Sequence, residues 1–319
     1  MKQFLILFIV VGQILVLGLQ AQARTQAENS LPTIASNDLS SITHLEYKPQ
    51  ERSENLFACA NEYVKRFKTP GELNIAVAFG YSDTTDEGFN LVTDQWTMKS
   101  LAQLLTGPCQ YSSQGFCEFN RISSEPHEIQ QYTRNLNITV DGTEQTITVN
   151  VLMMNSSYDG SHVDNLTTYK KEQLIKSEKA QTFYGWAIKN ADVVFYEGHS
   201  RDGGGPDFLP PRPASSGKVN YPWYRKNQPG LHFLLSQLEQ TETKPMLFGL
   251  FSCASQLHFK RKLSPYFTAT TSVMSTKVVQ ARFTKEALFY SMESLLNFEC
   301  NDSLATRLRG TSFVVNRAF

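Results

Sequence analysis

Two apolar segments of this chain each end on a side chain that can take part in covalent chemistry. The first segment, residues 192–198, reads DVVFYEG and is followed by His199. The second, residues 245–252, reads PMLFGLFS and is followed by Cys253. Continuous apolar runs are typical of buried strands in parallel sheets, and ligands bind beyond the carboxyl ends of such strands. Two neighbouring strands would therefore bring an imidazole and a thiol together, a pair capable of nucleophilic catalysis on a carbonyl.

Each residue alone has a simpler interpretation. A cysteine that ends an apolar run is often a small buried hydrophobe, and a single histidine is often a hydrogen-bonded structural residue. Their combination favours catalysis, because both lie at predicted strand ends and both are followed by small residues.

The elements that would position these residues alternate between helix and strand from Leu73 onward. Strands are expected at 73–80, 192–199, 245–253, 267–273 and 311–315, and helices at 56–68, 94–105, 169–189, 229–240 and 284–298. This alternation predicts a single α/β domain over residues 53–319, a three-layer sandwich with a mostly parallel central sheet. Alternating apolar and polar residues around Asp141 and Gly142 add a β-hairpin insertion.

The segment that follows His199, residues 203–229, is rich in proline and glycine. Long loops in compact domains tend to be functional or mobile, so this one either walls a substrate cleft or only covers the edge of the sheet. The candidates for a cleft are Gly198, Gly203, Asp207, Phe208 and Trp223.

The N-terminus has the pattern of an export signal. Residues 1–23 combine Lys2, an apolar stretch and small residues at the cleavage positions, which predicts a signal peptide. The stretch is too short for a good membrane span, so no stable membrane insertion is expected after cleavage. Residues 24–52 are polar and predict a flexible lead-in. The mature protein is therefore expected in the periplasm or outside the cell.

Charge and composition exclude several partners. Thirty basic and thirty acidic residues cancel, and the chain contains no basic block, so nucleic acid is not an expected partner. The six histidines form no His-Glu-x-x-His array and the cysteines no C-x-x-C pair, so neither a metal nor another cofactor is expected.

The five cysteines fit an oxidising compartment. Cys109 and Cys117 bracket a short polar stretch and are expected to pair. Cys59 and Cys300 lie on terminal segments that could be neighbours, which leaves Cys253 as the free thiol. Four cysteines allow three pairings, so spacing alone does not decide the connectivity.

The order of a strand ending on Gly198-His199, a helix, and a strand ending on Ser252-Cys253 resembles the caspase-like clan of cysteine peptidases. Caspases, metacaspases, legumain, gingipains, clostripain and separase belong to this clan. The spacing between the two residues is close to the ~50 residues found in caspases. The chain departs from the clan pattern at Ser200, where glycine is usual, and at Ser252, where alanine is common. The resemblance is therefore to a divergent, secreted, bacterial-type member and not to a caspase proper.

The resemblance implies a peptide or protein substrate and a Cys/His dyad. Cys253 would attack the peptide carbonyl, and His199 would protonate the leaving amine. Backbone N–H groups of Ser200 and Cys253 would hold the oxyanion. The clan needs no acidic third member, and none is assigned.

Two alternatives remain. A catalytically inactive member could keep the fold as a binding module. A serine hydrolase with Ser200 as its nucleophile is the other, although Asp202 occupies the position where the nucleophile elbow needs glycine. A helix that follows Ser200 directly would favour this second alternative.

Overall fold

The computed structural model describes residues 56–83, 90–109, 115–123, 125 and 127–317. The expected signal peptide (1–23) and lead-in (24–52) lie outside these ranges. The described residues all belong to one compact unit, Tyr47–Phe319. Within the described ranges, no helix combines the length and apolar character that a membrane span requires.

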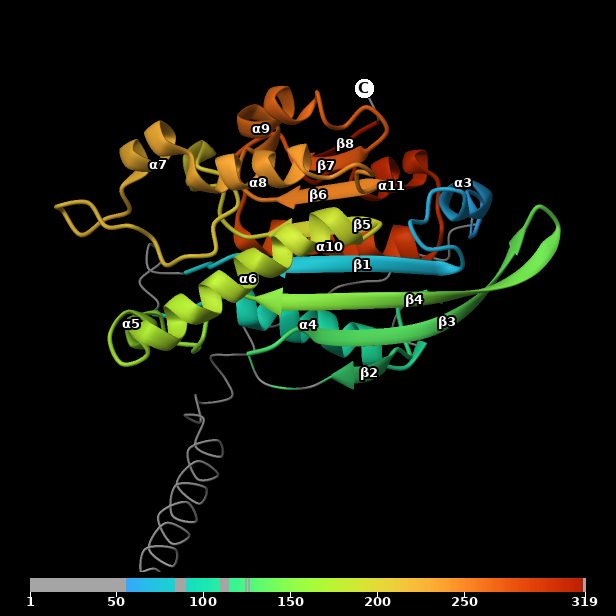
Figure 1. The fold of residues 1–319 in the computed structure, drawn as a ribbon, viewed down its shortest axis with the longest axis horizontal. Coiled ribbons are helices and arrows are strands. Elements are labelled where there is room, and N and C mark those ends of the chain that lie inside the picture. The colour runs from blue at the N-terminus through green and yellow to red at the C-terminus, as the bar shows by residue number, and fades with distance from the viewer. Residues whose placement is uncertain (1–55, 84–89, 110–114, 124, 126, 318–319) are drawn as a thin grey trace, which may run out of the picture. The chain divides into compact units, whose positions relative to one another are not determined.

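A mixed sheet forms the centre of the described unit, with the strand order β2-β3-β4-β1-β5-β6-β7-β8 (Figure 1). The strands are β1 (Glu72–Phe79), β2 (Asn120–Ser123), β3 (Gln130–Val140), β4 (Thr143–Asn155), β5 (Val193–Glu197), β6 (Leu247–Phe251), β7 (Thr271–Ser275) and β8 (Phe313–Asn316). Every neighbouring pair from β4 to β7 is parallel. The pairs β2/β3, β3/β4 and β7/β8 are antiparallel. The expected α/β class with a mostly parallel sheet is therefore confirmed.

Helices cover both faces of this sheet (Figure 1). They are α3 (Ala60–Val64), α4 (Asp94–Thr106), α5 (His162–Leu166), α6 (Lys170–Asn190), α7 (Tyr221–Asn227), α8 (Pro229–Glu239), α9 (Ser255–Leu263), α10 (Ala281–Leu296) and α11 (Asn301–Arg307). The apolar cluster on one face contains residues of α6, α8 and α9, and the cluster on the other contains residues of α3, α4, α10 and α11.

β5 shows why the first apolar run is continuous. Successive side chains of a strand point to opposite faces of the sheet. Val194 and Tyr196 accordingly pack in the cluster with α6 and α8, whereas Val193 and Phe195 pack in the cluster with α10. Because both faces are covered, every residue of β5 is buried.

The β3/β4 hairpin turns at Asp141 and Gly142, with Val140 paired to Thr143. β4 also pairs in parallel with β1 along its second half. The two strands are thus continuous with the central sheet.

Most boundaries shift by a few residues from those expected, and three segments differ more clearly. The helix expected at 56–68 is a single short helix, α3, because the chain enters it through turns. The strand expected at 267–273 starts only at Thr271, and Phe267 instead packs against Phe248 with 5.0 Å between ring centroids. The segment 203–229 contains α7, which begins at an N-cap: the Asn220 side chain accepts a hydrogen bond from the Trp223 N–H.

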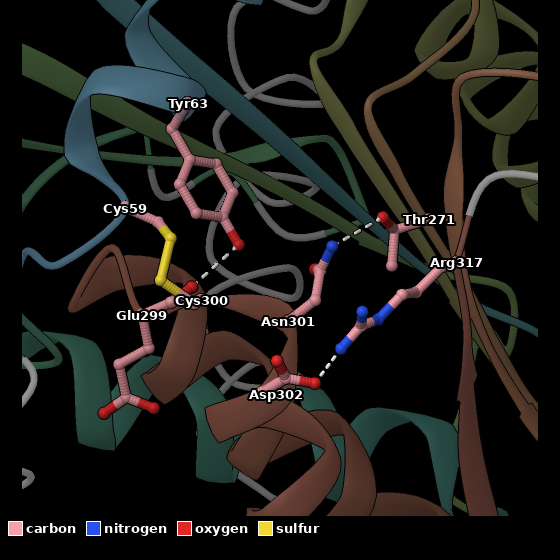
Figure 2. The surroundings of a disulfide bond; sticks show 8 residues. All are labelled: Cys59, Tyr63, Thr271, Glu299, Cys300, Asn301, Asp302 and Arg317. Atoms are coloured by element: carbon pink, nitrogen blue, oxygen red, sulfur yellow. Dashed lines mark hydrogen bonds and ion pairs between the residues drawn. A yellow bond between two sulfur atoms is a disulfide. The ribbon is translucent and has the colours of Figure 1, made fainter.

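Two disulfides join Cys59 to Cys300 and Cys109 to Cys117, the pairing expected from the sequence. Figure 2 shows the first, which links the residue before α3 to the residue before α11. The Tyr63 hydroxyl donates a hydrogen bond to the Glu299 carbonyl beside it, at 3.1 Å. Because this disulfide joins residues 241 positions apart, it constrains the unfolded chain strongly, and native disulfides of this kind contribute about 2–5 kcal/mol.

Candidate active site

The two strands that carry His199 and Cys253 are adjacent and parallel. β5 pairs with β6 so that Glu197 lies opposite Phe251. The Gly198 N–H continues the ladder by donating to the Phe251 carbonyl at 3.2 Å. His199 and Cys253 each follow two residues after this last pair, so both leave the sheet at the same carboxyl edge. This is the arrangement expected from the sequence.

Cys253 is the free cysteine of the chain and is half-buried. Its Sγ donates to the Val279 carbonyl at 3.3 Å, just before α10 begins. The backbone turns sharply after it: Ala254 has φ 47° and leads directly into α9. A left-handed conformation costs a residue other than glycine on the order of 1–2 kcal/mol, and such strain is concentrated at functional sites.

His199 lies beside Asp83, which follows β1. The His199 Nε2 is 4.0 Å from the Asp83 Oδ2, and the side chain of His199 is 33% exposed. Burial and the positive charge of Arg201 lower the pKa of His199, and the Asp83 carboxylate and a backbone hydrogen bond with Asp83 oppose this effect only in part. The imidazole is therefore neutral near pH 7 and can accept a proton, but its lowered pKa makes it a weaker base than a free imidazole.

Arg201 connects the histidine loop to two carboxylates. Its Nε is 2.9 Å from the Asp207 Oδ2, and its second contact is to the Asp83 Oδ2 at 3.5 Å. All three side chains are at most 12% exposed. Burial raises the pKa of Asp207, and the charge of Arg201 counteracts that rise. Arg201 thus holds Asp83 in place beside His199.

The two expected oxyanion donors follow the strand ends. Within the described residues, no hydrogen bond is present from the backbone N–H of Ser200 or of Cys253. Ser200 is only 2% exposed, so both its N–H and its hydroxyl are covered in this structure. A single 3-10 turn (Arg201–Gly203) and then a long irregular segment follow it, instead of the helix that a nucleophile elbow requires.

Three of the five cleft candidates lie together. Asp207, Phe208 and Trp223 line one pocket on the α6/α8 side. Gly198 and Gly203 are not among its lining residues. Gly198 instead packs against Gly80, where a Cβ would approach the Gly80 Cα to 3.1 Å, and Gly203 packs against His258.

Glu197, the last residue of β5, is a buried carboxyl group on the Cys253 side of the sheet. The Thr284 hydroxyl of α10 donates to its Oε1 at 2.7 Å, while its Oε2 has no hydrogen-bond partner among the described residues. Burial raises the pKa of Glu197 to about 7, against the opposing effects of the Thr284 hydrogen bond and of Lys285. The segment Val279–Lys285 therefore contacts both the thiol and this carboxyl group.

Glu197 predicts a pH dependence of stability. Its folded pKa (about 7) lies above its unfolded value (4.5), so the folded protein retains this proton over pH 4.5–7 while the unfolded chain releases it. The contribution to stability is full below about pH 4.5 and is lost as the pH rises to about 7. The free energy of unfolding of Glu197→Gln, relative to that of the native protein, should rise by on the order of 2–3 kcal/mol between pH 4.5 and pH 8. Urea unfolding at the two pH values measures this change.

A substitution of Thr284, the hydrogen-bond donor to Glu197, tests the same carboxyl group. Thr284→Val removes the hydrogen bond that lowers the folded pKa of Glu197, so the upper end of the pH window should rise while its lower end stays at about 4.5. An identical pH dependence in native protein and Glu197→Gln would show that Glu197 does not titrate in this range.

Sequence reasoning overlooked Asp83, Arg201 and Glu197. A signal existed for Asp83, because it lies just past the strand expected at 73–80, and β1 is the parallel neighbour of β5. Arg201 and Glu197 carry no comparable signal, because only the folded loop and α10 show what they contact.

A metal site is not formed by the part of the chain that the structure describes: no group of three or more His, Cys, Asp or Glu side chains is placed to hold an ion. The chain matches no family model, no curated protein and no solved structure. Its function is therefore inferred from the geometry of the site.

Proposed function

We propose that this protein is an exported cysteine endopeptidase that hydrolyses peptide bonds with a dyad of Cys253 and His199. The observation that carries the proposal is the pairing of β5 with β6, which delivers both residues to one sheet edge. The two disulfides fit an exported protein and leave Cys253 as the free thiol. The parallel order β1-β5-β6-β7 is compatible with the resemblance to the caspase-like clan.

The proposed reaction has two halves. The neutral imidazole of His199 takes the Cys253 proton, and the thiolate forms a bond to the peptide carbonyl carbon. The oxyanion accepts hydrogen bonds from the N–H groups of Ser200 and Cys253. His199 then protonates the amine as the C–N bond breaks, which leaves a thioester. In the second half, His199 removes a proton from water, the hydroxide attacks the thioester, and the thiolate leaves.

Asp83 is a positioning residue in this scheme. Its carboxylate faces His199 and stabilises the imidazolium that forms when the thiol loses its proton. The Arg201 guanidinium pairs with that carboxylate and orients it. The clan itself requires no such acidic residue, so Asp83 is an addition from the geometry.

An inactive binding module of the same fold is the second candidate. The hydrogen bond from the Cys253 Sγ to the Val279 carbonyl favours it, because a thiol that donates to a backbone carbonyl is not donating to an imidazole. Catalysis would require this bond to be exchanged for one to His199.

Covalent labelling distinguishes the two candidates. Purified mature protein is treated with a peptidyl acyloxymethyl ketone, and the modified residue is mapped by mass spectrometry. A peptidase should be labelled at Cys253, and His199→Ala should slow the labelling on the order of a hundredfold or more, because the thiol loses its base. Equal labelling rates in native protein and His199→Ala would instead support the binding module. Labelling of Cys253 by iodoacetamide serves as the control for simple access to the thiol.

A further inference from the structure

A second feature at the same edge of the sheet is a pocket that the dyad does not use. Its volume is about 270 Å³, and its walls come from residues 206–212, α6, α7 and the start of α8. Binding sites for whole small ligands are typically ~300–1,000 Å³. A pocket of this size therefore fits one large side chain better than an extended peptide.

The pocket is apolar inside and has a cation at its rim. Phe208, Leu209, Trp223 and Tyr224 supply aliphatic and aromatic walls. Arg212 also lines the pocket, and its guanidinium carbon lies 4.6 Å from the centroid of the Trp223 ring.

The carboxylate at the back of the pocket is not available to a ligand. The Asp207 Oδ2 is paired with the Arg201 Nε at 2.9 Å, and its Oδ1 accepts the Leu209 N–H at 3.2 Å. Arg212 has no such carboxylate partner within the described residues, so the uncompensated charge at this pocket is positive.

The wall of the pocket is held rigidly against α8. The Leu231 N–H donates to the Gly204 carbonyl at 3.0 Å. Gly205 has φ 105°, and a Cβ there would lie 2.0 Å from the Leu231 nitrogen. A Cβ at Gly230 would lie equally close, 2.0 Å, to the Pro206 carbonyl oxygen. The pocket is therefore formed before any ligand binds.

Hydrogen bonds connect the pocket to the histidine. The Tyr196 hydroxyl accepts the Asp207 N–H at 2.8 Å and donates to the His199 carbonyl at 2.9 Å. The Asp207 carbonyl in turn accepts the Tyr81 N–H at 3.1 Å. Asp207, which lines the pocket, is thus linked to the His199 backbone through the side chain of Tyr196.

We infer that this pocket selects the substrate: it takes a large apolar side chain, and Arg212 binds a carboxylate on the adjacent residue of the same peptide. The inference rests on the proposed function, since it makes the bound peptide the one presented to the dyad. The preferred substrate class is a peptide with a leucine or an aromatic residue followed by an acidic residue.

Direct binding to the Cys253→Ala variant tests this without turnover. Blocked tetrapeptides containing leucine–aspartate, alanine–aspartate or leucine–asparagine are titrated while tryptophan fluorescence is recorded. The leucine–aspartate peptide should bind on the order of ten- to a hundredfold more tightly than the alanine–aspartate peptide, because leucine buries its side chain in the pocket. It should bind about two- to fivefold more tightly than the leucine–asparagine peptide, as for an exposed ion pair.

Matched variants assign these preferences to the pocket. Arg212→Gln should abolish the preference for aspartate over asparagine, whereas Lys218→Gln, which removes an exposed positive charge from the same loop but does not line the pocket, should retain it. Trp223→Phe should remove the fluorescence change, whereas Trp186→Phe, at an exposed position on α6, should not.

The outcomes test the role of the pocket and the peptidase activity independently of each other. Equal affinity for the leucine and alanine peptides, or a fluorescence change that survives Trp223→Phe, contradicts the inference that this pocket binds the peptide side chain. Selective binding to Cys253→Ala together with no cleavage by the native protein supports the pocket and contradicts the proposed function. Cleavage by the native protein without selectivity for these peptides supports the proposed function and contradicts the role of the pocket.

Discussion

Cys253→Ala abolishes peptide turnover, His199→Ala lowers it nearly as far, and the double variant is scarcely worse than either single one. This non-additivity is expected because the thiol and the imidazole act as a unit: once either is gone, the other has no partner with which to exchange a proton. Each single variant should lower kcat/KM on the order of 10⁴-fold or more. The measurement is a double-mutant cycle on kcat/KM with the leucine–aspartate peptide as substrate.

Ser200→Ala is the matched control for this cycle. Ser200 contributes its backbone N–H to the proposed site, and its side chain is buried, so the variant should keep most of the activity. The reverse result, in which Ser200→Ala is inactive and Cys253→Ala active, would establish the serine hydrolase. Well-folded variants with no effect on any hydrolysis would leave the binding module as the function.

Arg201→Met lowers the free energy of unfolding by about 3–5 kcal/mol. Arg201 is 3% exposed and faces two carboxylates, Asp207 and Asp83, which would be left buried without a cation. Removing one partner from a buried ion pair costs about this much, because the remaining charge is not compensated. Urea unfolding at pH 7 measures the change.

Arg225→Met is the control for this second prediction. Arg225 forms an ion pair with Asp202 in the same part of the fold, but its side chain is 57% exposed. Exposed pairs contribute about 0–1 kcal/mol, so this variant should be nearly as stable as the native protein. Equal losses in the two variants would show that burial of the Arg201 network is not what stabilises the loop after His199.

The strands that carry the two candidate residues could be predicted from apolar runs in the sequence. Residues 192–198 and 245–252 are apolar because β5 and β6 are covered by helices on both faces, so their pattern predicted buried parallel strands with reactive residues at the ends. The helix expected at 169–189 is present as α6, but it is not cleanly amphipathic, because it buries Gln173 and Lys176 and exposes Leu174. Boundaries were less well predicted where packing overrides the pattern, as at Phe267, whose ring fills the core from a turn.

The α/β class and the mostly parallel sheet could be predicted from the sequence alone. These properties depend on periodicity and residue type, which the chain carries locally. The folded structure was needed for the cysteine pairing, which joins Cys59 to a residue 241 positions away, and for the surroundings of the two candidate residues. Asp83, Arg201 and Glu197 are charged or polar letters in the sequence, but their effects depend on distance, burial and the orientation of partners that are far apart along the chain. Electrostatic energies change steeply with these quantities, and chain folding alone sets them.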